Sequence, residues 1–258
     1  MITKNQIKYI HSLGIKKFRD KERCFLAEGP KVVLDLLPLM ECRTLFATPE
    51  FINKNRQKIP SNVKSVIEVS KTELERLSLL CAPRETLALF EYPDTLDNLD
   101  ELNQIASSLL CLALDGVQDP GNLGTIIRIA DWFGIEHIFA SKNTADVFSP
   151  KVVQATMGAI GRVHVHYLDL EEFFSKMSPE TPLWGTFLDG KNVYHENLIN
   201  KGIIVMGNEG NGISPEVSNY INKRLFIPNY PTGKETSESL NVAVATSIIC
   251  SEFRRILH

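Results

Sequence analysis

Long apolar segments are missing from this chain of 258 residues: no run approaches the roughly 18 residues that span a membrane. Residues 1–6 also lack the charged segment followed by an apolar stretch that begins a secretory signal, so we expect neither a signal peptide nor a membrane anchor. The hydrophobic content of 43% and the charged content of 23% are typical of a globular protein with one large or two modest domains.

Paired cysteines are also absent. The five cysteines are odd in number, lie far apart and include no Cys-x-x-Cys pair, which argues against a disulfide framework and a zinc site. The pattern predicts a reducing compartment, the cytoplasm, and cysteine side chains that serve as small buried hydrophobic groups. No metal site is expected. The five residues are Cys24, Cys42, Cys81, Cys111 and Cys250.

An overall basic excess, which would favour nucleic-acid binding, is absent, since the net charge is −3. The charge is unevenly distributed, however. Residues 1–95 carry 16 Lys and Arg against 12 Asp and Glu, which is +4, whereas residues 96–258 carry 12 against 19, which is −7. The split predicts that the N-terminal part meets polyanions. Within it, the basic residues 15–23 form either a contact to RNA phosphates or an ordinary solvated face.

An acidic stretch rich in Pro, Asp and Asn at residues 91–101 marks a domain boundary. Before it, residues 31–37 follow a Gly-Pro turn and are typical of a helix, and three short apolar segments are typical of strands. The sequence therefore predicts a small α/β domain at residues 1–95, followed by a linker at residues 96–108. The three expected strands are residues 44–47, 66–69 and 87–90.

Apolar segments alternate with helical patterns from residue 109 onward. Near-continuous apolar strands that alternate with helices are typical of a parallel sheet with helices on both faces. Ligands bind such sheets at the carboxyl ends of the strands, where three loops carry unusual residues. The expected strands are residues 109–117, 135–140, 163–167, 184–188, 203–206 and 225–227, and the expected helices are residues 125–133, 150–157, 214–219 and 239–257.

The first of these loops, residues 114–124, leads into the helix expected at residues 125–133. Four apolar residues of that helix form a stripe that should pack on the sheet, and Arg128 lies off this stripe. Arg128 is either paired with Asp131 on the helix surface or, together with Asn122 in the loop, faces a ligand above the strand ends. The stripe consists of Ile126, Ile129, Ala130 and Phe133.

The second loop, residues 203–214, contains Gly207, Gly210 and Gly212, which permit close approach of the backbone. Their order, G-x-x-G-x-G, differs from the dinucleotide-binding fingerprint G-x-G-x-x-G. Glu209 lies among these glycines, where its carboxylate would repel a phosphate. The loop therefore suits a ribose hydroxyl or a cationic ligand better than an anion.

The third loop, residues 227–246, contains the sequence Gly-Lys-Glu-Thr at residues 233–236. It is not a phosphate-binding loop, because Pro228 stands where that motif requires its first glycine and a Glu separates Lys from Thr. Ser239 and Asn241 open the last expected helix. Their side chains either cap that helix or meet a ligand at its exposed amides.

Taken together, the three loops resemble the three motifs of the SpoU (TrmH-like) RNA 2′-O-methyltransferases of the SPOUT superfamily, in the same order. Residues 28–29 and the pattern after them resemble the N-terminal RNA-binding domain of that family, which is similar to a small ribosomal protein. After Pro228 the third loop is longer than the family's pattern, and Asn229 stands where Met is typical. The motifs are matched by residues 119–124, 128 and 133–134, by residues 206–214, and by residues 227–228 and 239–242.

The resemblance implies a trefoil knot in the parallel-sheet domain at residues 109–258, and a homodimer formed through that domain. It also implies the cofactor S-adenosylmethionine, whose ribose and sulfonium would suit Glu209. The family's functional positions are matched by Asn122, Arg128, Glu209, Ser239 and Asn241. Expected cofactor contacts are Thr186, Phe187, Leu188, Gly190, Met206, Gly207, Asn208, Glu209, Gly210, Ile227, Ser239, Leu240 and Asn241.

The activity implied by the resemblance is methyl transfer from S-adenosylmethionine to a ribose 2′-hydroxyl of structured RNA, rRNA or tRNA. Because a free guanidinium stays protonated, we expect Arg128 to orient ribose and phosphate and to stabilise the developing alkoxide. Two alternatives remain open. One is a non-catalytic RNA-binding member of the fold, against which the matched functional residues argue. The other is a knotted methyltransferase that acts on a base, although the Asn, Glu and Ser-Leu-Asn set favours ribose.

Overall fold

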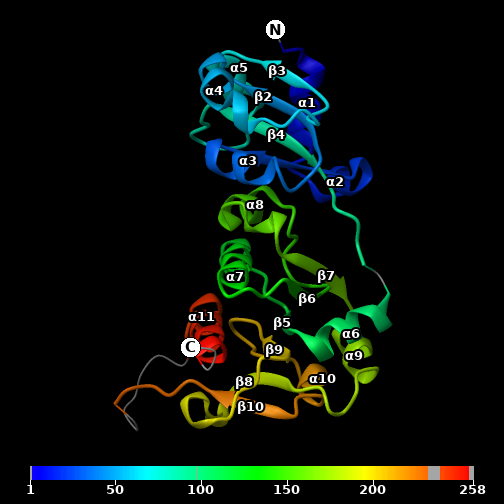
Figure 1. The fold of residues 1–258 in the computed structure, drawn as a ribbon, viewed down its shortest axis with the longest axis vertical. Helices are drawn as coiled ribbons and strands as arrows, with labels where there is room; N and C mark the ends of the chain where they lie inside the picture. Colours follow the sequence, from blue (N-terminus) through cyan, green and yellow to red (C-terminus); the bar gives the residue numbers. More distant parts are fainter. Residues whose placement is uncertain (1, 97, 232–238, 256–258) are drawn as a thin grey trace. The chain divides into compact units, whose positions relative to one another are not determined.

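Two compact units make up the computed structural model, which describes residues 2–96, 98–231 and 239–255 (Figure 1). The first unit comprises Met1–Asp94 and Asp146–Arg162, and the second comprises Thr95–Ala145 and Val163–His258. Each unit has a sheet and a hydrophobic core of its own. Among the described residues, no helix is long and apolar enough to cross a membrane.

The first unit is built on a four-stranded sheet in the order β1-β4-β2-β3. β4 lies antiparallel to both of its neighbours, whereas β2 and β3 are parallel to each other. Three strands coincide with the apolar segments expected from the sequence. β1 is buried along its whole length and therefore lacks the alternating pattern that would predict it. The strands are β1 (Cys24–Glu28), β2 (Cys42–Ala47), β3 (Val66–Glu68) and β4 (Thr86–Glu91).

Short helices accompany this sheet, and local sequence signals fix where several of them begin. Capping boxes start α1 at Thr3 with Gln6 and α5 at Ser70 with Glu73. Pro30 occupies the first turn of α3, where its fixed φ suits the helix, and this helix confirms the one expected after the Gly-Pro turn. The helices are α1 (Lys4–Ser12), α2 (Lys16–Glu22), α3 (Pro30–Leu36), α4 (Pro49–Asn55), the 3-10 turn η1 (Arg56–Lys58) and α5 (Lys71–Leu77).

Residues 146–162 interrupt the second unit in the sequence but pack with the first. They form α8 (Pro150–Thr156), which contacts β1, and the 3-10 turn η2 (Ala159–Gly161). Phe148 stacks on Tyr92 with ring centroids 4.1 Å apart and lies 4.9 Å from the ring of Phe25. The alternation of strands and helices along the chain predicts no such exchange, because it records chain order and not contact.

A buried ion pair fastens this segment to α2. Arg19 Nη2 lies 2.5 Å from Asp146 Oδ2, and Nη1 donates to the carbonyl of Leu13 at 2.7 Å. The side chains of Arg19 and Asp146 are only 3% and 16% exposed. The phosphate-contact interpretation of residues 15–23 is therefore wrong for Arg19, whose guanidinium is buried and already bonded.

The second unit is built on a six-stranded sheet in the order β10-β8-β9-β5-β6-β7. Every neighbouring pair is parallel, which confirms the α/β class with a parallel C-terminal sheet. The apolar segments expected to be strands coincide with these strands, although their ends shift. The strands are β5 (Leu110–Leu114), β6 (His137–Ser141), β7 (His164–Leu168), β8 (Leu183–Asn192), β9 (Gly202–Met206) and β10 (Lys223–Phe226).

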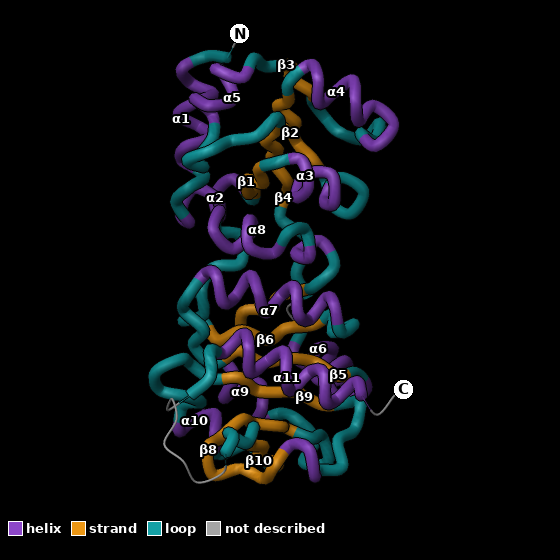
Figure 2. Tube along the Cα trace, turned by 90° about the vertical axis from the view of Figure 1, so that its left-hand side faces the viewer, coloured by secondary structure: helices purple, strands orange, loops and turns teal. Residues whose placement is uncertain are grey.

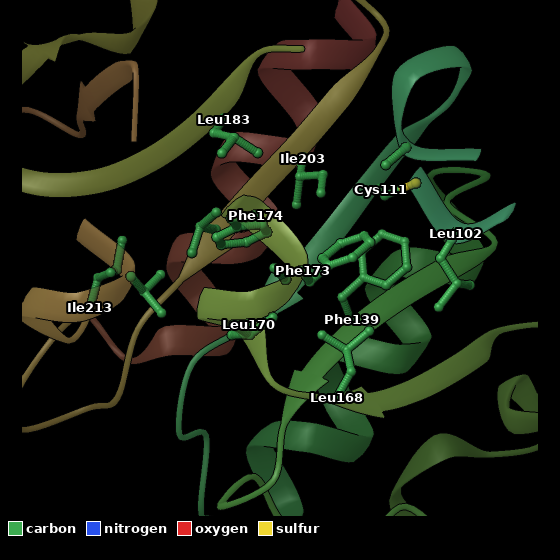
Figure 3. Close-up of a cluster of buried hydrophobic side chains, with 14 residues drawn as sticks. Leu102, Cys111, Phe139, Leu168, Leu170, Phe173, Phe174, Leu183, Ile203 and Ile213 are labelled. Atoms are coloured by element: carbon green, nitrogen blue, oxygen red, sulfur yellow. The ribbon is translucent and has the colours of Figure 1, made fainter. Parts of the chain in front are cut away.

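Helices cover both faces of this sheet, as the two views of the chain show (Figures 1 and 2). α7 and α11 pack against each other on one face, and α6, α9 and α10 lie on the other. On the latter side, Phe139, Phe173 and Ile203 belong to one buried cluster (Figure 3). The helices are α6 (Leu99–Ser108), α7 (Pro120–Trp132), α9 (Leu170–Ser175), the 3-10 turn η3 (Val193–His195), α10 (Pro215–Ser218) and α11 (Val242–Arg255).

Two helices differ from their expected extents for identifiable reasons. Residues 99–108, expected within a linker, form α6, because Asn98 caps its first turn and Leu102 and Ala106 bury an i, i+4 face. α7 begins at Pro120, five residues before the expected start, because the side chain of Asp119 caps it. Its buried stripe is accordingly Leu123, Ile126, Ile127 and Ala130.

The ion pair between Arg19 and Asp146 makes a testable contribution to stability. Asp146→Asn should lower the free energy of unfolding by about 3 kcal/mol, because it leaves a buried guanidinium without its countercharge. Asp20→Asn is the matched control: it breaks an exposed pair with Lys16 and should cost less than about 1 kcal/mol. Urea denaturation measures both variants, and equal losses would contradict a structural role for the buried pair.

Candidate active site

Polar loops meet at the carboxyl ends of β5, β6 and β9, the edge at which a parallel sheet binds ligands. Asn208, two residues after β9, donates through Nδ2 to the carbonyl of Gly116 after β5 at 2.8 Å. The amide of Gly116 in turn donates to Ser141 Oγ at the end of β6 at 2.8 Å. Gly116 has a φ of 72°, which glycine adopts without strain. The three strand ends are therefore held in one arrangement.

Three of the five expected functional residues form a hydrogen-bonded chain at this edge. Asn122 Nδ2 donates to Glu209 Oε1 at 2.8 Å, and Asn241 Nδ2 donates to Asn122 Oδ1 at 2.9 Å. The residues come from α7, from the loop after β9 and from the start of α11. Segments that are 87 and 119 residues apart in the sequence thus meet at one carboxamide.

Each member of this chain is held by its own local structure. The amide of Asn122 donates to Asp119 Oδ1 at 2.8 Å, which fixes Asn122 in the first turn of α7. Asn241 Oδ1 accepts from the amides of Ala243 and Val244, so Asn241 caps α11. The capping interpretation of Asn241 and the ligand interpretation are therefore compatible, since Oδ1 caps the helix while Nδ2 reaches Asn122.

Arg128 lies on the exposed side of α7, about two turns after Asn122. Within the described ranges it makes no hydrogen bond or ion pair, and the surface pair with Asp131 considered from the sequence does not form. The guanidinium is therefore exposed, on the same helix as Asn122. Ser239 is also exposed, and its side chain has no hydrogen-bond partner in the described part of the chain.

The segment 186–190 leaves the ladder between β8 and β10. Gly185 is the partner of Arg224 and Lys191 is the partner of Leu225, so five residues of β8 stand opposite no residue of β10. A Cβ on Gly190 would lie 2.4 Å from the backbone of Leu225, so only glycine lets the segment rejoin the sheet there. The segment contains the expected cofactor contacts Thr186, Phe187, Leu188 and Gly190.

Arg224 holds this segment, and no sequence motif pointed to it. Its guanidinium carbon lies 3.5 Å from the centroid of the Phe187 ring, and Nη2 lies 2.6 Å from Asp189 Oδ1. The Arg224 guanidinium lowers the pKa of the Asp189 carboxyl, so this carboxyl is ionised at neutral pH. A basic residue directly before the apolar Leu225 and Phe226 is the only sequence signal, and it is a weak one.

Of the remaining expected cofactor contacts, Met206 lies beside this segment. Thr186 Oγ1 lies 3.9 Å from Met206 Sδ, which joins the 186–190 segment to the end of β9. A Cβ on Gly207 would lie 2.1 Å from the carbonyl carbon of Gly212, so the turn after β9 closes tightly upon itself. Leu188 and Leu240 are 75% and 49% exposed and present apolar surface to solvent. Residues 232–238 of the long third loop lie outside the described residues.

Four of the five cysteine side chains are buried. Burial raises the pKa of Cys24 to about 11 and those of Cys42, Cys111 and Cys250 to about 12, so these thiols stay protonated and unreactive. The expectation of burial is wrong for Cys81, which is exposed. In the part of the chain that the structure describes, no group of three or more His, Cys, Asp or Glu could hold a metal ion.

Comparison with known proteins gives two family matches, one in the N-terminal part of the chain and one in the C-terminal part. Residues 109–251 match the SpoU rRNA Methylase family, and residues 4–88 match the MRM3-like substrate binding domain. In sequence, the chain is 29% identical over 257 residues to the 23S rRNA (guanosine(2553)-2′-O)-methyltransferase RlmP of Bacillus subtilis, with 97% of each chain covered.

Solved structures agree over the whole length. A protein of Porphyromonas gingivalis assigned to the TrmH family of RNA methyltransferases has a TM-score of 0.86 and 41% identity, with 99% of each chain covered. An AdoMet-bound rRNA methyltransferase of Sinorhizobium meliloti has a TM-score of 0.85 and 30% identity, with 100% of this chain and 97% of that chain covered. The match to the SpoU rRNA Methylase family spans more than half of the residues of this chain. The chain therefore belongs to that family.

Proposed function

We propose that this SpoU family member transfers the methyl group of S-adenosylmethionine to a ribose 2′-hydroxyl of RNA, rRNA or tRNA. The observation that carries the proposal is the Asn122–Glu209–Asn241 chain at the carboxyl edge of the parallel sheet, beside an exposed Arg128. The relatives named for rRNA 2′-O-methylation and the AdoMet-bound structure support the same reaction and cofactor.

The residues present suit S-adenosylmethionine. Thr186 joins the 186–190 segment to the end of β9 at Met206, and the exposed Leu188 and Leu240 offer apolar surface of the kind that suits an adenosine moiety. Glu209 supplies a carboxylate for ribose hydroxyls or for a cation. When bound, the cofactor supplies an electrophilic methyl group on a sulfonium. The other residues assigned to this site are Thr186, Phe187, Gly190, Met206, Gly207, Asn208, Gly210, Ile227, Ser239 and Asn241.

Arg128 acts on the RNA, whereas the Asn122–Glu209–Asn241 chain keeps the site in its arrangement. Arg128 binds the RNA phosphate and orients the ribose, and its positive charge stabilises the alkoxide that develops as the 2′-hydroxyl passes its proton to water. Asn122 keeps Glu209 and Asn241 in place through its two bonds, and Ser239 orders the same site. Because the guanidinium remains protonated, it acts by orientation and charge rather than as a free base.

The two halves of the chain have separate tasks in this proposal. Residues 1–95 bind RNA, as their +4 charge and the match to a substrate binding domain suggest, and residues 109–258 hold the cofactor in a knotted domain. Two chains form a homodimer in the cytoplasm through this C-terminal domain. Trp132 on α7 and Val244 on α11 are 84% and 50% exposed, and such apolar surface favours a protein partner.

Arg128→Ala tests the proposed role of Arg128. The variant should lower the methyl-transfer rate at least roughly a hundredfold, since the loss of a transition-state contact costs about 3 kcal/mol in barrier. Its melting temperature and its affinity for S-adenosylmethionine should not change, because Arg128 is exposed and packs in no core. Single-turnover assays and calorimetry measure these quantities. Near-normal turnover would remove Arg128 from the chemistry.

Asn122→Asp and Asn122→Ala test separately the charge and the hydrogen bonds of residue 122 in the Asn122–Glu209–Asn241 chain. Both should slow methyl transfer, but the Asp variant more so at alkaline pH, because its carboxylate would face that of Glu209 at hydrogen-bond distance. Lowering the pH should restore part of its rate, as the two carboxylates then share a proton. Asn211→Ala, in the same loop as Glu209, is the control and should stay near normal. Identical pH profiles for Asp and Ala variants would contradict this account.

Arg224→Met tests whether the 186–190 segment needs its clamp. Losing one cation–π contact and one ion pair should raise the dissociation constant of S-adenosylmethionine about tenfold, which is about 1.4 kcal/mol. The turnover number at saturating cofactor should stay near normal, because Arg224 touches no reacting group. Lys223→Met removes the neighbouring exposed cation and serves as the control. A tenfold loss in both variants would point to general electrostatics.

A further inference from the structure

The first unit contains a cavity of about 600 Å³ that the proposed chemistry does not use. The residues that line it include Thr48, which caps α4, and Leu74 of α5, both buried with exposures of 1% and 3%. Pro30 and Pro83 line it as well. The volume lies in the range of small-molecule sites and is large enough for one nucleotide, and the two half-buried prolines offer apolar surface to a flat base.

Four basic side chains line the same cavity, and each comes from a different element. Lys31 lies on α3, Lys54 on α4, Lys71 on α5 and Arg84 in the loop before β4. Lys31 is paired with Asp35 at 3.2 Å. The other three make no ion pair within the described ranges. Unpaired cations gathered around one hollow raise its positive potential and attract a polyanion.

The loop that carries Arg84 has a strained backbone at the cavity. Glu85 has a φ of 50°, a left-handed conformation that a residue with a Cβ adopts at a cost of about 1 kcal/mol. The carbonyl of Glu85 accepts a hydrogen bond from the backbone amide of Thr48 at 2.9 Å, so the strained residue is bonded to another residue that lines the cavity. Strain of this kind gathers at ligand clamps, where the surroundings hold it in place.

We infer that this cavity binds an unpaired nucleotide of the RNA substrate. The base lies on the apolar surface of the two prolines, and the flanking phosphates contact Lys54, Lys71 and Arg84. Glu75 and Glu85 also line the cavity and accept hydrogen bonds from the amino and imino groups of a base. A hollow of this size admits a splayed-out nucleotide and not a duplex. The inference rests on the proposed function, because it takes RNA as the substrate.

The test uses the full-length protein and two short RNA hairpins that differ only by one bulged uridine. Wild-type protein should bind the bulged hairpin more tightly than the paired one. Lys54→Gln with Lys71→Gln should weaken binding of the bulged hairpin at least about tenfold, should erase the preference for the bulge, and should reduce the slope of log affinity against log salt by about 1.4 to 1.8.

The matched control is Lys4→Gln with Lys8→Gln, which removes the same charge from exposed positions on α1 outside the cavity. This control should change affinity less than about twofold. Equal losses in both double variants, or no preference of the wild type for the bulge, would overturn the inference. A competition experiment with the acidic peptide poly-glutamate could also overturn the inference. If the peptide competes with the hairpin for the wild type and loses affinity only for the cavity variant, the occupant of the cavity is a protein segment.

Failure of this inference and failure of the proposed function have different signatures. The cavity variant should keep the wild-type affinity for S-adenosylmethionine, measured by calorimetry, since both lysines belong to the first unit. If the wild type methylates RNA while the cavity and control variants lose hairpin affinity equally, only the cavity assignment is wrong. If the wild type transfers methyl groups to no RNA, the proposed function itself is wrong.

Discussion

The carboxamide of Asn122 is the contact on which the candidate site depends. One amide accepts at its oxygen from Asn241 and donates at its nitrogen to Glu209, so it joins three loops that are far apart in the sequence. A carboxylate could accept from Asn241 but could not donate to Glu209, and an ammonium could do only the reverse. The position therefore demands a side chain that donates and accepts at once, as the carboxamide of Asn does through its nitrogen and its oxygen.

The sheet beneath makes this contact possible. Because its strands are all parallel, their carboxyl ends lie at one edge of the sheet, and the loops that follow neighbouring strands lie next to one another. Asn208, Gly116 and Ser141 bond the loops directly above the strands. The 186–190 segment leaves the ladder of the sheet and contacts the end of β9 through Thr186 and Met206, and Arg224 on the neighbouring strand holds the segment in place. The site is thus a property of the sheet edge and not of any single motif.

The sequence pointed to three of the polar residues that meet at the sheet edge, but not to the residues that surround them. Asn122, Glu209 and Asn241 stand in polar motifs that lie next to apolar strands or helices, and such motifs are visible without a structure. Arg224 and the gap in pairing at residues 186–190 were not visible, because the strand expected at residues 184–188 runs into the segment and contact partners leave no local signal. The buried role of Arg19 was hidden for the same reason, since its partner Asp146 follows 127 residues later.

The central claim, that the chain methylates a ribose 2′-oxygen of RNA, has one direct test. RNA from cells that lack this protein would be incubated with the purified protein and S-adenosylmethionine labelled at its methyl group, and the labelled nucleotide would then be identified by mass spectrometry. The account predicts a label that stays with the ribose when the base is released. A label on the base, or no label in any RNA although the protein binds the cofactor, would contradict it.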